Sequence, residues 1–118
     1  MTGSALLAGC FGYTRTMPED YELLNAGYVD GDAWLDIAYS GEEDGRIQYR
    51  LFIEESGVFV EDSSTQVKML ETGGSYRLTA PIDAMFDVSN SSIGLRLINP
   101  AIEGGTRGKD LDVGSVPI

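Results

Sequence analysis

The clearest structural feature of this 118-residue chain is the stretch Arg46-Ile47-Gln48-Tyr49-Arg50-Leu51-Phe52-Ile53. Its odd-numbered positions are all apolar, whereas Arg46, Gln48 and Arg50 are polar. Successive side chains of a β-strand point to opposite faces, so this alternation predicts a strand with one face in a hydrophobic core. The stretch therefore indicates a β-protein.

A second alternating stretch lies directly upstream. Leu35, Ile37 and Tyr39 are separated by single residues, and the acidic segment 40–45 that follows ends in Asp-Gly. A short polar loop ending in Asp-Gly is typical of a β-hairpin. We therefore predict that residues 34–39 and 46–53 pair as neighbouring antiparallel strands.

Further short strands follow along the chain. Apolar or alternating runs bounded by Gly, Ser, Asn or Pro predict strands at 58–61, 66–70, 76–80, 85–88, 93–97 and 111–113. The segment 18–24, which begins Pro18-Glu19-Asp20, predicts a short helix or a loop. Together these runs predict an all-β fold of about seven or eight strands, a small antiparallel β-sandwich or barrel with jelly-roll-like or immunoglobulin-like topology.

The chain has the length of one domain with an extended segment at each end. We expect a β-domain over residues 18–100, an apolar N-terminal arm or edge strand over 1–17 and a Gly-rich C-terminal arm over 101–118. Ordering a residue costs ~1–2 kcal/mol, and an isolated domain gives an arm little to pack on. Neighbouring subunits are therefore expected to hold the arms. The candidate assembly contacts are Leu6, Leu7, Phe11, Tyr13, Arg107 and Lys109.

The chain is strongly acidic, with 19 Asp and Glu against 8 Lys and Arg, a formal charge of −11 and a pI near 4.1. This charge opposes nucleic-acid binding, which needs clustered basic residues. Lysine is depleted to Lys68 and Lys109, yet 42% of residues are hydrophobic. At molar salt the Debye length is ~3 Å, so crowded carboxylates repel one another little. The composition therefore indicates adaptation to high salt, with an ordinary acidic protein and a DNA mimic as alternatives.

The residue inventory excludes several kinds of site. The chain has no histidine and one cysteine, Cys10, which excludes an internal disulfide, His/Cys zinc sites and histidine-dependent nucleophilic catalysis. The stretch 30–32 resembles the start of a calcium loop, but Trp34 and Leu35 stand where an EF-hand needs an oxygen ligand and a glycine. The acidic groups 42–44 and 110–112 are interpreted as solvated loops. We therefore predict no catalytic residue, metal or cofactor.

The stretch Leu7-Ala8-Gly9-Cys10 resembles the lipobox of secreted lipoproteins, in which the cysteine is lipidated after a signal segment is cleaved. Only nine residues precede Cys10 in this sequence and none of them is basic, which differs from a signal peptide. These departures favour a packed apolar arm over residues 5–13.

No stretch of the sequence approaches the ~20 consecutive apolar residues that a membrane-spanning helix needs. We therefore predict no membrane span.

These observations predict a function that involves no catalysis. We expect a non-enzymatic structural subunit whose partners are other protein subunits, in a homo- or hetero-oligomeric assembly. A virion protein of a halophilic system, such as a capsid decoration, turret or tail component, fits this size, so the expected location is the virion or the extracellular space. The alternative is a binding module on the cell surface, lipid-anchored through Cys10. A hydrolase that uses acidic residues is the third possibility.

Adaptation to high salt predicts a specific thermal behaviour. The melting temperature should rise steadily with KCl up to molar concentrations, because screening relieves repulsion between carboxylates and salt strengthens apolar association. Circular dichroism melts across a KCl series measure this effect. A flat or falling melting temperature would remove the halophilic interpretation.

Overall fold

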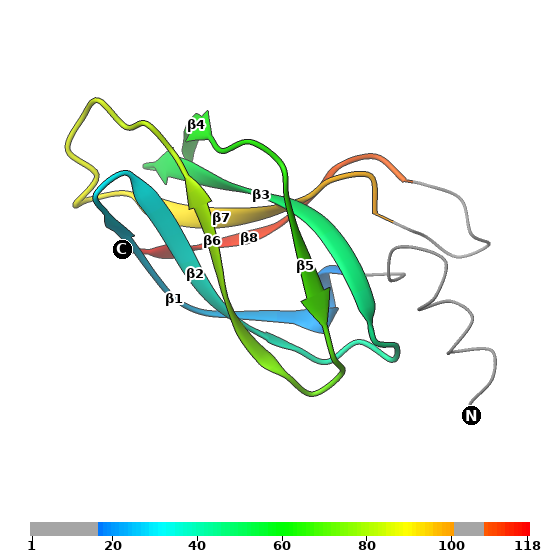
Figure 1. Ribbon diagram of the computed structural model, residues 1–118. Coiled ribbons are helices and arrows are strands. Elements are labelled where there is room, and N and C mark those ends of the chain that lie inside the picture. The colour runs from blue at the N-terminus through cyan, green and yellow to red at the C-terminus, as the bar shows by residue number, and fades with distance from the viewer. Residues whose placement is uncertain (1–16, 101–107) are drawn as a thin grey trace.

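The computed structural model describes residues 17–100 and 108–118, which form two antiparallel β-sheets packed face to face (Figure 1). The elements are the 3-10 helix η1 (Pro18–Asp20) and the strands β1 (Tyr21–Val29), β2 (Asp32–Tyr39), β3 (Gly45–Glu55), β4 (Val58–Asp62), β5 (Gln66–Leu70), β6 (Ser75–Pro81), β7 (Ser92–Leu97) and β8 (Leu111–Pro117). The predicted all-β fold of seven or eight strands is confirmed.

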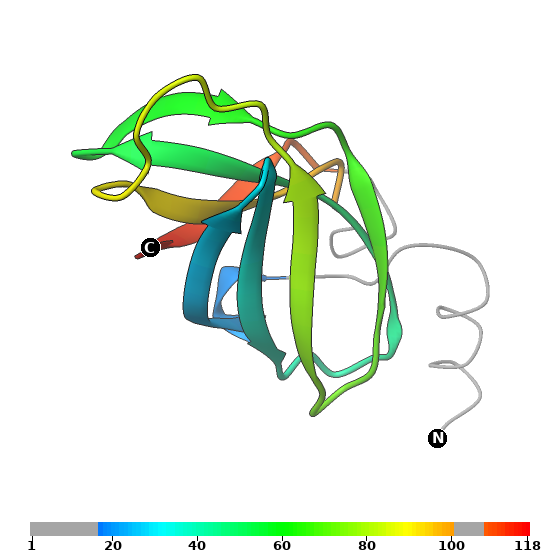
Figure 2. The ribbon, with the colours of Figure 1, turned by 60° about the vertical axis from the view of Figure 1, so that its left-hand side comes forward.

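The strand order identifies the sandwich topology. One sheet has the order β1-β2-β6, and the other has the order β4-β3-β7-β8, with β5 also paired to β3. The first, second and sixth strands thus face the third, seventh and eighth. This arrangement is immunoglobulin-like, which was one of the two topologies expected from the sequence. Figure 2 shows the two sheets as facing layers.

The core lies between the two sheets and is built from alternate residues of both. β2 contributes Leu35 and Ile37, and β3 contributes Leu51 and Ile53, all with no exposed surface. Burying such a side chain contributes ~1.5–3 kcal/mol, so these four residues account for a sizeable part of the stability of the fold. Other buried members are Tyr21, Ala33, Tyr39, Ile47, Tyr49, Leu70, Leu78, Ala80, Ile82, Ile93, Leu95 and Leu97.

The predicted hairpin between residues 34–39 and 46–53 is wrong. β2 pairs with β1 and β6, whereas β3 pairs with β4, β5 and β7 in the opposite sheet. The two strands face each other across the core, which explains why both show the same alternation. The loop between them crosses from one sheet to the other, and it is fixed where the Tyr39 hydroxyl donates to the Glu43 carbonyl at 2.7 Å and the Thr72 N–H donates to Asp44 at 2.8 Å.

Two further differences concern β1 and residues 85–88. The short helix or loop expected over residues 18–24 begins as the single turn η1, but residues from Tyr21 onward form the unpredicted strand β1. A register shift between Leu23 and Asn25 interrupts the alternation of β1, so its sequence lacks the strand pattern. The strand expected over 85–88 is absent, because those residues lie in the connection from β6 to β7 and Met85 is exposed there.

The remaining predicted strands are present. Those expected at 58–61, 66–70, 76–80 and 93–97 correspond to β4, β5, β6 and β7. The last one, expected at 111–113, extends to Pro117 as β8 and pairs with β7 at the margin of the second sheet. This end of the chain is therefore part of the sandwich.

The account of the core predicts a large difference between two substitutions in the same sheet. Leu51→Ala should lower the free energy of unfolding by ~2–5 kcal/mol, because it leaves a cavity between the sheets. Val58→Ala, at an exposed position of β4, should change it by no more than ~0.5 kcal/mol. Urea unfolding in molar KCl measures both values. Equal losses for the two variants would contradict this placement of the core.

Candidate interaction face

The side chains that β3 does not bury define the outer face of the five-stranded sheet, called here the outer face. Since Ile47, Leu51 and Ile53 enter the core, the residues between them point to the other side. The strand registers then place side chains of four further strands beside them. The outer face comprises Arg46, Gln48, Arg50, Phe52, Glu54, Phe59, Asp62, Val67, Met69, Ser92, Gly94, Arg96, Asp112 and Ser115.

An aromatic cluster lies at the centre of the outer face. Phe52 lies opposite Gly94 of β7, and a Cβ added to Gly94 would collide with the Phe52 ring. The Phe59 ring lies 6.1 Å from that of Phe52, and the Arg96 guanidinium lies 5.3 Å and 5.4 Å from the two rings. Phe52 is therefore buried although it points away from the core.

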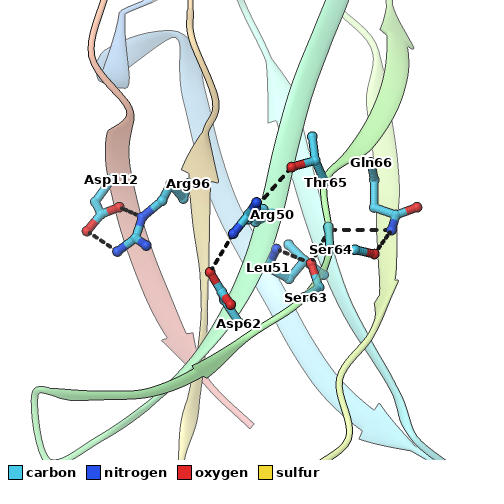
Figure 3. Close-up of polar contacts among 9 residues, drawn as sticks. All are labelled: Arg50, Leu51, Asp62, Ser63, Ser64, Thr65, Gln66, Arg96 and Asp112. Carbon is cyan, nitrogen blue, oxygen red and sulfur yellow. Dashed lines mark hydrogen bonds and ion pairs between the residues drawn. The ribbon is translucent and has the colours of Figure 1, made fainter.

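The two arginines at the middle of the outer face are held by carboxylates of neighbouring strands (Figure 3). Arg96 donates Nε to Asp112 Oδ1 at 2.6 Å and Nη2 to Oδ2 at 3.2 Å, a bidentate pair that raises the pKa of Arg96 above its usual range. Arg50 donates Nη1 to Asp62 at 3.2 Å and Nε to the Thr65 hydroxyl at 2.9 Å. Both guanidinium groups are thus hydrogen-bonded within the chain.

Charge is distributed unevenly between this face and the rest of the protein. The outer face carries the cations Arg46, Arg50 and Arg96 and the anions Glu54, Asp62 and Asp112, so it is formally neutral. The other basic residues that the structure describes are Lys68, Arg77 and Lys109. The net charge of −11 therefore resides on other parts of the molecule.

Three large apolar side chains of the outer face are open to solvent. Phe59 is 48% exposed, Val67 55% and Met69 63%. They come from β4 and β5, which follow one another along the side of β3 that faces away from β7. Val67 and Met69 lie two residues apart on β5, opposite Gln48 and Arg46, whereas Phe59 lies opposite Glu54 near the other end of β3. A solvent-facing sheet surface is normally polar, so apolar groups along its length are unusual. A neutral face with exposed apolar groups fits contact with protein better than contact with water or a charged ligand.

The opposite sheet carries a related arrangement on its own outer side. A Cβ on Gly27 would meet the Trp34 ring at 2.5 Å, and the Arg77 guanidinium lies 3.9 Å from the centre of that ring. Arg77 also makes a bidentate pair with Asp36 at 2.7 Å and 3.0 Å, which holds the pKa of that carboxyl below its usual range. An aromatic ring over a cross-strand glycine, next to an arginine paired with an aspartate, thus occurs on both sheets.

A hollow lies between the 3-10 helix η1 and the acidic loop 40–44. Met17, Glu19, Asp20, Glu42 and Glu43 line this hollow, which has a volume of about 390 Å³. Within residues 17–100 and 108–118, no three Asp, Glu or Cys side chains converge closely enough to hold a metal ion. The hollow is therefore interpreted as a solvated acidic surface.

Several of the described carboxylates have structural partners. Asp36 and Asp112 pair with arginines, and Asp44 accepts the Thr72 N–H. Asp110 accepts the Asn99 N–H at 3.0 Å, which fixes the entry into β8. These acidic residues position loops and strands.

The sequence-predicted contact residues and the outer face do not coincide. Leu6, Leu7, Cys10, Phe11, Tyr13 and Arg107 lie outside the described residues. Lys109 is exposed just before β8. Sequence reasoning missed Phe59, Val67 and Met69, although the alternation of Val67 and Met69 with Gln66 and Lys68 is visible in β5.

Comparisons with known proteins gave no match: no family model fits the chain, and no curated protein or solved structure is significantly similar to it. Within the part of the chain that the structure describes, no helix is long and apolar enough to cross a membrane.

The aromatic cluster predicts a coupling between Gly94 and Phe52. Gly94→Ala should destabilise the protein by ~1–3 kcal/mol, because the new methyl group displaces the Phe52 ring. In a Phe52→Ala background the same substitution should cost at least ~1 kcal/mol less, because the obstructing ring is gone. A double-mutant cycle by urea unfolding tests this. Strictly additive losses would show that the two residues do not touch.

Proposed function

We propose that this chain is a non-enzymatic structural subunit of a larger assembly, and that its outer face is a contact surface within that assembly. The observation that carries the proposal is a neutral, partly apolar sheet face on a chain with a net charge of −11. The assembly we propose is a virion of a halophilic system, in which the chain serves as a capsid decoration, turret or tail component. Its place is then the virion or the extracellular space.

The physical setting favours assembly through this face. At high salt the repulsion between acidic surfaces is screened, and apolar association is strengthened by salts excluded from the protein surface. Phe59, Val67 and Met69 then gain most from being covered. The arginines bring no unpaired charge into such a contact, because Arg50 and Arg96 already have carboxylate partners.

Two of the described carboxylates are unsuited to the proton-donor role that the hydrolase alternative requires. A general acid needs a raised pKa, as in the acid of a glycosidase pair. Asp36 and Asp87 both have a lowered pKa, Asp36 because of its bond to Arg77 and Asp87 because it accepts bonds from Ser89. Groups of this kind stay ionised and suit structural pairing better than proton donation.

A second candidate function is a lipid-anchored binding module on the cell surface. The lipobox-like stretch Leu7–Cys10 stands ten residues ahead of β1, which begins at Tyr21. Seven residues, 11–17, separate Cys10 from η1, and seven residues span at most ~25 Å. This reach would hold a β-domain clear of a membrane surface. In this case the outer face would bind a ligand or protein outside the cell.

Fractionation of the producing culture separates the two functions. We expect the chain in purified particles, in a fixed ratio to other particle proteins and with an unmodified Cys10 by intact mass. Recovery in the cell envelope, with acyl chains on Cys10 and the preceding residues removed, would contradict the virion proposal and establish the lipoprotein.

A further inference from the structure

We infer that the partner of the outer face is a second copy of this chain, bound face to face through the two five-stranded sheets around a two-fold axis. This inference rests on the proposed function, because it names the first contact of the assembly. The occupant is identified by three properties of the outer face: its charge balance, its area and the pairing of its ionic groups.

Charge balance restricts how two copies can approach. Each chain carries −11, so most pairs of surfaces from two copies bring like charges together. The outer face carries three cations and three anions, so two outer faces meet without net repulsion. Having both signs on one surface also suits an isologous contact, in which the same patch is used on both copies.

The outer face is large enough for a specific contact between two copies. Strands β3, β4, β5, β7 and β8 are 11, 5, 5, 6 and 7 residues long. With strands ~4.8 Å apart and a rise of ~3.3 Å per residue, they cover roughly 540 Å² per copy. Two such faces would bury ~1,100 Å² in total, above the ~1,000 Å² that a specific protein interface should clear.

The side chains of the outer face also suit sheet-on-sheet packing. Phe59, Val67 and Met69 provide apolar groups that a facing sheet can cover. The Arg96 guanidinium lies over the Phe52 ring and donates Nε and Nη2 to the two carboxylate oxygens of Asp112, so its charge is paired when water is excluded. We therefore expect dimerisation to strengthen as KCl rises, since the remaining repulsion comes from acidic residues around the contact.

The test uses the full chain and two pairs of matched substitutions. Met69→Glu and Val67→Glu place a carboxylate on the outer face. Met85→Glu and Val29→Glu make the same changes at positions outside it that are 88% and 60% exposed. Analytical ultracentrifugation in molar KCl, over a range of protein concentrations, gives the mass and the dissociation constant. Near-UV circular dichroism of each variant confirms that it is folded.

We expect the measured mass of the wild-type protein to rise from 12.7 kDa to twice that value as the protein concentration increases. Met69→Glu and Val67→Glu should weaken the dimer by ~10-fold or more, whereas Met85→Glu and Val29→Glu should leave the dissociation constant unchanged. A wild type that stays at 12.7 kDa at all salt and protein concentrations would overturn the inference, and so would equal weakening by a variant and its matched control. A monomeric chain that still fractionates with particles would leave the proposed function standing and reject only the second copy as partner.

Discussion

The period-two alternation of β3 is the constraint on which the rest of the structure depends. Leu51 and Ile53 enter the core because they point to one side, so Arg50 and Phe52 must point to the other. β3 also pairs with β4, β5 and β7, and this brings side chains from distant parts of the chain beside its outward residues. The same strand thereby organises both the hydrophobic core and the candidate interaction face.

The outer face accounts for where the few arginines of this acidic chain are placed. Arg50 and Arg96 are each held by an aspartate of a neighbouring strand, which neutralises the sheet surface around the Phe52 ring. The acidic excess is left to other surfaces, where water and salt can solvate it. The outer face is thus a broad surface through which the chain can approach another acidic body at little electrostatic cost.

The fold class could be predicted from sequence because alternation and turn residues are local properties, as in β5 and β7. Strand pairing could not, since the loop 40–44 can equally turn back or cross between sheets, and both outcomes bury the same residues of β2 and β3. A register shift concealed β1. The outer face could not be predicted either, because it depends on strand pairing. Asp62 and Asp112 lie next to arginines only because β4 pairs with β3 and β8 pairs with β7.

The most direct measurement of the central claim is the oxidation rate of Met69 in the assembled protein, read by peptide mass spectrometry. Peroxide oxidises accessible thioethers, and both Met69 and Met85 are exposed in the single chain. At molar KCl and high protein concentration, Met69 should oxidise much more slowly than Met85, and on dilution the Met69 rate should rise to the value set by its 63% exposure in the single chain. A Met69 rate that does not change between high and low protein concentration would contradict the account.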